Sequence, residues 1–439
     1  MRLPGAKRAR VKVLRHAALT LLILLAACSQ APLEPTLEAG PTLTVARPPA
    51  PLPVIAATAT PVRATQIAIW TDWDPVELEA LRAVLALYSE AHPGVEFSLA
   101  FFPPGDLLDA YLNCLAEGGC PSILIGPSSW GPLLVEQDGV TDISAFIDAQ
   151  LQRDLYPIAW SQVDYDGTTA GLPLELQGIV LYRNASLVPT RNSQLSGLIR
   201  DADALRTESL QPSVFDFSFT NALPFITACG GDPFSPQGEL KIDNEAGLCW
   251  LGLLSDWGGA GRVVVDSSDD RESFVGGTSG WLIDTSLAFQ ALTRALSAAN
   301  LKVDPWPVLD ATGEPLKGFV WTENVYLAPQ GGIDELEANW EFARFLFDPA
   351  AQALLSDPAG PAHIPVQESV ILQDPAQQTI SDMLRSGVPY PLRNDLARFS
   401  APVNALIGSV IQKGAEPLQA LGALEASLQT ATPTPAFEP

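Results

Sequence analysis

Tryptophans stand beside polar residues at several points in this sequence, which has 10 of them. Trp73 lies between Asp72 and Asp74, and Trp321 precedes Glu323 by two positions. An indole ring presents an apolar face, while carboxylate and amide groups form hydrogen bonds with hydroxyls. Such side chains, gathered in a concave site, suit a neutral, hydroxyl-rich solute with apolar ring faces, which is the chemistry of a sugar.

Motifs for catalysis or metal binding are scarce. The chain has no G-x-S-x-G, H-E-x-x-H or phosphate-binding G-x-x-x-x-G-K-[ST] motif. Its three histidines, His16, His92 and His363, are each predicted to be signal, surface or turn residues. The acidic run from Asp266 has Arg271 where a calcium loop needs glycine. We therefore expect no metal, no cofactor and no catalysis. A glycoside hydrolase, whose two carboxylates need a fixed separation, stays open as the enzyme alternative.

The N-terminal segment carries chemistry of another kind, a cysteine directly after an apolar run. Six basic residues precede the apolar stretch 17–27, which is too short to span a membrane permanently, and Ala26 and Ala27 lead into Cys28. This arrangement resembles the bacterial lipoprotein box, which implies a signal peptide over 1–27 and acylation of Cys28. An ordinary cleaved signal is the alternative. The Pro-, Ala- and Thr-rich stretch 28–65 is predicted to be a linker, and 432–439 a disordered tail.

Charge excludes some partners. Removing residues 1–27 leaves 19 Lys and Arg against 50 Asp and Glu, a net charge of −31. Nucleic acid needs a basic face, so it is not expected as a partner. The same charge opposes docking on anionic lipids, and membrane contact should run through the lipid anchor alone.

Four cysteines remain besides Cys28, namely Cys114, Cys120, Cys229 and Cys249, and they allow three disulfide pairings in an exported chain. Pairing of sequence neighbours, Cys114 with Cys120 and Cys229 with Cys249, is preferred because each bond closes a short loop. A four-cysteine zinc site is the alternative, although the spacings do not match the usual zinc knuckles.

Strand and helix patterns alternate from residue 66 onward. An apolar strand over 66–71 ends before Asp74, which is placed to cap a helix with Pro75 at its first position and Glu77 at the capping-box position. Strands at 95–102 and 122–126 flank a second helix at 105–119. Later strands are predicted at 178–184, 278–284 and 319–329, and helices at 219–231 and 244–257. This order indicates an α/β fold with ligands beyond the carboxyl ends of the strands.

A family resemblance rests on segments found in order along nearly all of 66–430. The chain resembles the extracellular solute-binding proteins of family 1, the maltose-type receptors of ABC importers. The segments are IAIWTDWDPVELEALRAVLALYSEAHPGVEFSLAF, SILIGPSSWGPLLVEQDGVTDIS, GLPLELQGIVLYRNASLV, LPFITACGGDPF, ESFVGGTSGWLID, GFVWTENVYLAP and NWEFARFLFDPAAQALLSDPAGPAHIPVQES.

The resemblance implies a two-lobe, periplasmic-binding-protein-like fold of type II, each lobe a mixed, mostly parallel sheet flanked by helices. The first lobe would comprise 66–176 plus 318–365 and the second 177–317 plus 366–431, with crossings near Gln177 and Gly318. It also implies a monomeric, extracytoplasmic receptor, lipid-anchored to the cell membrane, that hands a carbohydrate from an interlobe cleft to a permease with cytoplasmic ATPases.

Ligand contacts carried over from the family lie at matching positions. In the first lobe these are the turn after the first strand, the end of the third strand and the first crossing, where Gln177 replaces a frequent glutamate and Glu175 points the same way. The second lobe and second crossing supply the others. The candidates are Asp72, Trp73, Asp74, Ser129, Trp130, Glu175, Gln177, Phe219, Asn221, Trp281, Asp284, Trp321, Glu323 and Asn324.

Some candidates have equally ordinary structural explanations. Asp74 already serves as a helix cap, and Trp281 fits a core position better than a stacking position. The family's stacking tryptophan near 284–286 is absent. A receptor of the same fold for a non-sugar solute stays open, although an acidic chain with scattered tyrosines favours neither an anion nor iron.

Overall fold

The computed structural model describes residues 64–206, 213–235, 237–329 and 332–430. The predicted signal peptide, Cys28, the linker up to residue 63 and the tail lie outside the described residues. The strands are β1 (Thr65–Thr71), β2 (Val95–Phe101), β3 (Ile123–Pro127), β4 (Asp164–Tyr165), β5 (Thr168–Thr169), β6 (Leu172–Asn184), β7 (Val214–Asp216), β8 (Arg262–Val264), β9 (Trp281–Thr285), β10 (Leu301–Asp304), β11 (Phe319–Leu327) and β12 (Val388–Pro389).

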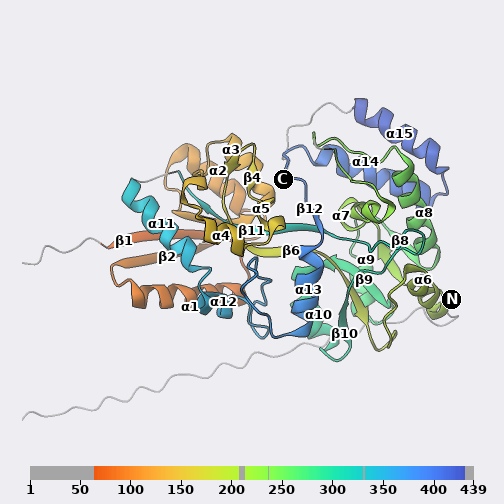
Figure 1. The fold of residues 1–439 in the computed structure, drawn as a ribbon, viewed down its shortest axis with the longest axis horizontal. Helices are drawn as coiled ribbons and strands as arrows, with labels where there is room; N and C mark the ends of the chain where they lie inside the picture. The colour runs from red at the N-terminus through yellow and green to blue at the C-terminus, as the bar shows by residue number, and fades with distance from the viewer. Residues whose placement is uncertain (1–63, 207–212, 236, 330–331, 431–439) are drawn as a thin grey trace, which may run out of the picture. The chain divides into compact units, whose positions relative to one another are not determined.

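Helices fill most of the chain between the strands (Figure 1). They are α1 (Pro75–Ala91), α2 (Leu107–Glu117), α3 (Gly131–Glu136), α4 (Ala149–Asp154), α5 (Pro157–Trp160), α6 (Leu195–Leu205), α7 (Phe219–Ala222), α8 (Glu245–Gly259), α9 (Asp269–Val275), α10 (Phe289–Leu296), α11 (Ile333–Phe345), α12 (Pro349–Leu355), α13 (Pro375–Arg385), α14 (Ala397–Ile407) and α15 (Pro417–Thr430).

One mixed sheet organises the described residues. Its strand order is β10-β6-β11-β3-β1-β2, with β9 also paired to β6 and β12 to β11. Parallel pairing joins β1 to β2, β1 to β3 and β11 to β12, whereas β6 pairs antiparallel with β9, β10 and β11. The alternating elements and mixed sheet agree with the predicted α/β class, although antiparallel pairing is more frequent than the resemblance implies.

Strands β6 and β11 lie in the middle of the sheet and connect β9 and β10 on one side to β3, β1 and β2 on the other. We call β6 and β11 the crossing strands. The first part of β6, up to Gly178, pairs with β11, while Ile179–Arg183 pairs with β9. Beyond its pairing with β6, β11 pairs with β3. The sheet is therefore continuous, and Figure 1 shows both strands running side by side through its middle. The lobe boundaries themselves stay a prediction.

Glycine allows the crossing strands to approach closely. A Cβ atom on Gly178 would lie 2.4 Å from the Phe319 carbonyl oxygen, and one on Gly318 would lie 2.1 Å from the Ile179 carbonyl oxygen. Real Cβ atoms do not tolerate such distances, so only glycine fits where the strand pairing changes.

The first helix forms as its sequence predicts. Asp74 caps α1 by accepting hydrogen bonds from the backbone N–H groups of Val76 and Glu77, and Pro75 takes the first helical position. The Glu77 side chain accepts a return bond from the Asp74 backbone N–H at 2.6 Å, which completes a capping box. The apolar stripe on α1 is buried in the main core.

The chain after β7 differs from its prediction. One continuous helix was expected over 219–231, but α7 ends at Ala222 and a 3-10 helix continues over Leu223–Cys229. Pro224 explains the change, because proline in an α-helix interior removes a hydrogen bond and clashes with the preceding turn.

The four cysteines pair as neighbours, Cys114 with Cys120 and Cys229 with Cys249, which are the pairs preferred from the sequence. No helix among the described residues is long and apolar enough to cross a membrane.

Candidate functional site

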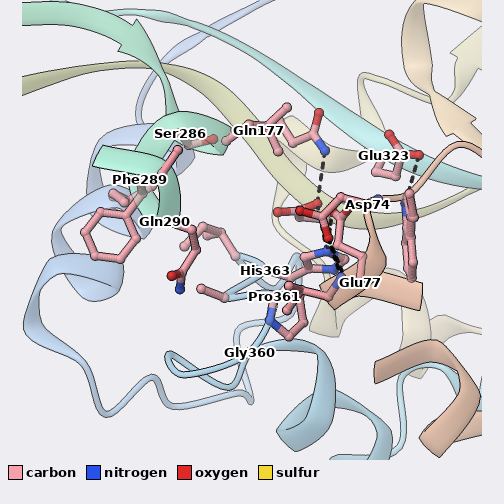
Figure 2. A pocket seen from close by; sticks show the side chains of 18 of the residues that line it. Asp74, Glu77, Gln177, Ser286, Phe289, Gln290, Glu323, Gly360, Pro361 and His363 are labelled. Atoms are coloured by element: carbon pink, nitrogen blue, oxygen red, sulfur yellow. Dashed lines mark hydrogen bonds and ion pairs between the residues drawn. The ribbon is translucent and has the colours of Figure 1, made fainter. Parts of the chain in front are cut away.

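A cavity of about 460 Å³ opens beside the crossing strands. It brings together the turn after β1, the β6 and β11 strands, the start of α10 and a loop at 360–364 (Figure 2). We call it the site pocket. Seven predicted contacts line it, namely Asp72, Trp73, Asp74, Glu175, Gln177, Trp321 and Glu323.

Strand pairing sets the floor of the pocket. Trp321 lies opposite Gln177 across the crossing strands, and Glu323 lies opposite Glu175. Because side chains alternate along a strand, these four residues share one face of the sheet. The Trp321 indole N–H donates to Gln177 Oε1 at 2.9 Å, and Gln177 Nε2 donates to Glu175 Oε2 at 3.0 Å. Gln177 and Glu175 therefore point the same way, as the pleat predicts.

A buried histidine, His363, borders this floor. His363 was predicted to be a surface or turn residue, but it is only 4% exposed. Its Nε2 lies 3.1 Å from Glu77 Oε1 and 3.8 Å from Glu175 Oε2. The prediction was wrong because the loop at 360–364 folds inward, with the Leu176 N–H donating to the Ile364 carbonyl oxygen.

Electrostatics in the pocket are dominated by buried carboxyl groups. Burial raises the pKa of Glu323 well above its ordinary value, and repulsion from Glu175, Asp72 and Glu77 adds to the rise. Burial also raises the pKa of Glu175, against the opposing effects of His363 and Gln177, and the pKa of Asp72.

The charge on His363 follows from its neighbours. Burial by itself lowers the pKa of His363, but Glu175 and Glu77 more than offset this effect, so the pKa is raised. His363 is thus the internal counter-ion of Glu175 and Glu77.

The wall facing the carboxylates comes from the 3-10 turn Ser286–Ala288 and the start of α10, and we call it the α10 wall. Figure 2 shows Ser286, Phe289 and Gln290 on one side of the cavity, and Asp74, Glu77, Glu323 and His363 on the other. The α10 wall was not predicted from the sequence, because its residues do not pair polar with aromatic side chains in a predicted loop. Of the missed residues, only Glu77 carried a visible signal, its place in the capping box. The missed lining residues that matter here are Glu77, Ser286, Phe289, Gln290, Arg294, Pro361 and His363.

Trp73 supports the pocket from within the core. It is 4% exposed, its indole N–H donates to Glu323 Oε1 at 3.3 Å, and its ring meets His363 edge-on at 4.9 Å. It therefore borders the pocket as a positioning residue more than as an open stacking surface.

The other seven predicted contacts do not line this pocket. Ser129 is exposed, and the Trp130 ring packs over Gly126, where a Cβ would lie 2.2 Å from the ring. Trp281 is 2% exposed in β9, so the core explanation for it holds. Asn324 is 1% exposed and faces the opposite side of β11 from Glu323.

The remaining three predicted contacts form hydrogen bonds or are buried elsewhere in the protein. Asp284 is held by Arg271, with both carboxylate oxygens accepting at 2.7 Å. Asn221 Nδ2 donates to Asp216 Oδ2 at 3.0 Å. Phe219 is 1% exposed, and its backbone N–H donates to Asn404 Oδ1 at 2.6 Å. The geometry gives none of these residues a place at the site pocket. Among the described residues, no cluster of His, Cys, Asp or Glu is suited to hold a metal ion.

Solved structures with the same fold are sugar-binding proteins by name. A cyclic α-maltosyl-1,6-maltose binding protein from Arthrobacter globiformis matches with a TM-score of 0.74 at 17% identity, over 83% of this chain and 98% of that one. A cyclo/maltodextrin-binding protein matches with 0.73 at 18%, over 83% and 97%. A Thermus thermophilus maltotriose binding protein matches with 0.66 at 18%, over 83% and 99%. These likenesses confirm the two-lobe, periplasmic-binding-protein-like fold.

The family itself comes from the sequence. The model described as bacterial extracellular solute-binding protein matches residues 83–381, which is more than half of the chain. This family binds solutes outside the cytoplasm and is not a family of enzymes, so the glycoside hydrolase alternative falls away. The chain therefore belongs to the bacterial extracellular solute-binding proteins.

Proposed function

We propose that this protein is a lipid-anchored receptor that captures a carbohydrate in the site pocket and delivers it to an ABC permease. The observation that carries the proposal is the pocket floor, where Glu175, Gln177 and Glu323 converge beside the Trp321 ring. Carboxylate and amide groups bind hydroxyls, and an indole covers an apolar sugar face.

The names of the structural relatives support the same ligand class. Their printed descriptions name maltotriose, maltotetraose and cyclic α-maltosyl-1,6-maltose. Because those proteins share only the fold at this identity, the carbohydrate assignment for this chain rests on the pocket together with the family.

Capture would involve both walls of the pocket. The acidic floor belongs to the crossing strands and the facing wall to α10. A solute that touches both walls favours their approach, and it shifts the population toward a closed state by its preference for that state. Small-angle scattering tests this step, since unchanged dimensions at saturating ligand would contradict closure.

Calorimetry tests the ligand class. The purified chain in detergent is titrated with maltose, maltotriose and maltotetraose, and with amino acids and inorganic phosphate. We expect binding to at least one saccharide and none to the other two classes. Exclusive binding of an amino acid or phosphate would refute the carbohydrate proposal.

The anchor is tested separately. We expect radiolabelled palmitate to be incorporated into the wild-type chain and not into Cys28→Ser. The substituted chain should leave the membrane fraction while keeping its solute affinity, because Cys28 precedes the folded body by a long linker. Equal membrane retention of the two chains would argue for an ordinary signal or another anchor.

A further inference from the structure

Two buried glutamates lie directly opposite each other in the floor of the site pocket. Glu323 and Glu175 are cross-strand partners and are 5% and 4% exposed. Like charges at this position destabilise a sheet, and burial adds the cost of removing each carboxylate from water. Such a pair needs a counter-ion or a bound proton.

Among the described residues, only one of the two glutamates has a potential counter-ion. His363 contacts Glu175 and Glu77. Within the described residues, Glu323 receives one side-chain hydrogen bond, from the neutral Trp73 indole to Oε1, and none to Oε2. Asp72, which repels Glu323, accepts no hydrogen bond from another side chain among the described residues, and its carboxylate is stabilised by its own backbone.

The remaining cation at the pocket belongs to the other wall. Five carboxyl groups line the cavity, those of Asp72, Asp74, Glu77, Glu175 and Glu323, against Arg294 and His363. Arg294 is exposed on α10, the helix that carries Phe289 and Gln290, and it makes no ion pair in the described ranges. The acidic end of the pocket is therefore short of positive charge.

Resting on the proposed carbohydrate function, we propose that the solute carries a protonated amine that binds beside Glu323 and Asp72. The site then takes an amino-substituted, hydroxyl-rich solute. The ammonium group donates to Glu323 Oε2 and to the Asp72 carboxylate, while hydroxyls meet Gln177 and Gln290 and an apolar sugar face lies on the Trp321 ring. Hydrogen bonds between charged groups are stronger than neutral ones, so the amine dominates selectivity.

The raised pKa of Glu323 adds a second signature. An ammonium group near a carboxyl stabilises the charged form and lowers that pKa, so binding should release protons. Added salt should weaken amine binding more than neutral sugar binding, because only the former has a charge–charge component.

The test uses solutes that differ in one group. A glucosamine oligomer, a glucose oligomer of the same length and linkage, maltotriose and spermidine are titrated into the purified chain at about pH 6, where amines of this kind are protonated. We expect the glucosamine oligomer to bind about tenfold or more tighter than its glucose counterpart, and tighter than spermidine. Titration in buffers of different ionisation enthalpy should report proton release for the amine alone.

Variants assign the effect to its residues. Glu323→Gln and Asp72→Asn should each lower the ratio of glucosamine-oligomer affinity to glucose-oligomer affinity about tenfold. Glu79→Gln is the matched control, since it removes one negative charge from an exposed position on α1 outside the pocket and should leave the preference unchanged.

Failure of this inference is distinct from failure of the proposed function. Equal binding of the two oligomers would overturn the amine inference and keep the carbohydrate receptor. Binding of spermidine alone would overturn the hydroxyl-rich part and the carbohydrate proposal with it. An equal loss of preference in Glu79→Gln would show that overall charge, not the pocket, attracts the amine.

Discussion

The two faces of β11 differ in how fully their polar side chains are hydrogen-bonded. On the pocket face, Glu323 has one hydrogen bond among the described residues and a carboxyl oxygen left for other contacts. On the opposite face, Thr322, Asn324 and Tyr326 form a neutral network in which each polar group is used. Thr322 Oγ1 donates to Asn324 Oδ1 at 2.6 Å, Asn324 Nδ2 donates to the Tyr326 hydroxyl at 3.1 Å, and that hydroxyl donates to the Pro127 carbonyl at 2.9 Å.

Strand alternation explains how one segment serves both purposes. Side chains on successive positions point to opposite faces, so charge can be concentrated on one face without disturbing the other. The neutral face links β11 to Ser128 and Gln162, through the Thr322 N–H to Ser128 Oγ at 3.3 Å and Asn324 Nδ2 to the Gln162 carbonyl at 3.3 Å. The comparison indicates that the neutral face stabilises the strand, while the contacts proposed for the ligand lie on the charged face.

Loss of the neutral network should have the largest effect. Asn324→Leu removes an acceptor for Thr322 and a donor to Gln162, and leaves buried polar groups without partners. We expect the free energy of unfolding to fall by about 3 kcal/mol, measured by urea denaturation. A change below about 1 kcal/mol would break the assignment of this face to stability.

Removal of the pocket ring should come next. Trp321→Ala leaves a void in the floor and frees Gln177 Oε1, so saccharide affinity should weaken by about 2 kcal/mol in calorimetry. Trp281→Phe is the control, since that ring lies in the core outside the pocket and should alter stability without a matching loss of affinity. Unchanged affinity in Trp321→Ala would show that the ligand does not bind on this face of β11.

A second acidic cluster, away from both faces, sets part of the pH dependence. Burial raises the pKa of Asp270 to about 7 and the pKa of Asp216 to about 6, and nearby Asp284 adds to both. A raised carboxyl pKa means that the stabilising contribution is full below the unfolded value and is lost as pH rises through the folded value. Stability should therefore fall between about pH 4 and pH 8.

Polar and charged groups that face this cluster also influence its titration. Asp216 accepts from Asn221 and from the Asp266 N–H, and Asp284 is paired with Arg271. Asp270→Asn should remove about 1 to 2 kcal/mol of the pH-dependent loss, measured by urea denaturation at several pH values. His363, with its raised pKa, changes stability in the same direction and should account for part of the remainder. If Asp270→Asn leaves the dependence of stability on pH unchanged, Asp270 does not contribute to it.

The smallest effect is expected from Glu323→Gln on stability. Because burial raises the pKa of Glu323, replacing its carboxyl with an amide should raise the free energy of unfolding by about 1 kcal/mol in alkaline solution and less in acid, where the protonated form is favoured. Thermal denaturation at the two pH values measures it. Destabilisation at both would assign Glu323 to the structural face and erase the contrast with Asn324.

Local patterns predicted the elements well and the site in part. The capping residues before α1, the strand–helix alternation and the pairing of cysteines follow from nearby sequence, and the structure shows all three. Glu175 and Gln177 were found because alternation on one strand places them on the same face. Glu323 and Asn324 were indistinguishable in sequence, since the orientation of β11 is set by its pairing with two other strands.

The rest of the site depends on contacts between distant segments. His363 lies 286 positions from its partner Glu77, and no local pattern indicates that the loop carrying it folds inward. The α10 wall faces the pocket only because β9 pairs with β6. Trp130 and Trp281 carried a polar–aromatic signal that also describes ordinary packing, so composition could not separate ring stacking on a ligand from burial in a core.

Gly178 packs against the Phe319 carbonyl and Gly318 against the Ile179 carbonyl, so the pocket floor and the predicted crossings between the lobes lie on the same stretches of chain. The proposed closure of the lobes would twist the backbone one residue from Gln177. Under the proposed function, the stiffness of the crossings and the fit of the pocket to its solute would therefore change together. A substitution that stiffens the crossing strands to slow solute release would also change the surface proposed to bind the solute.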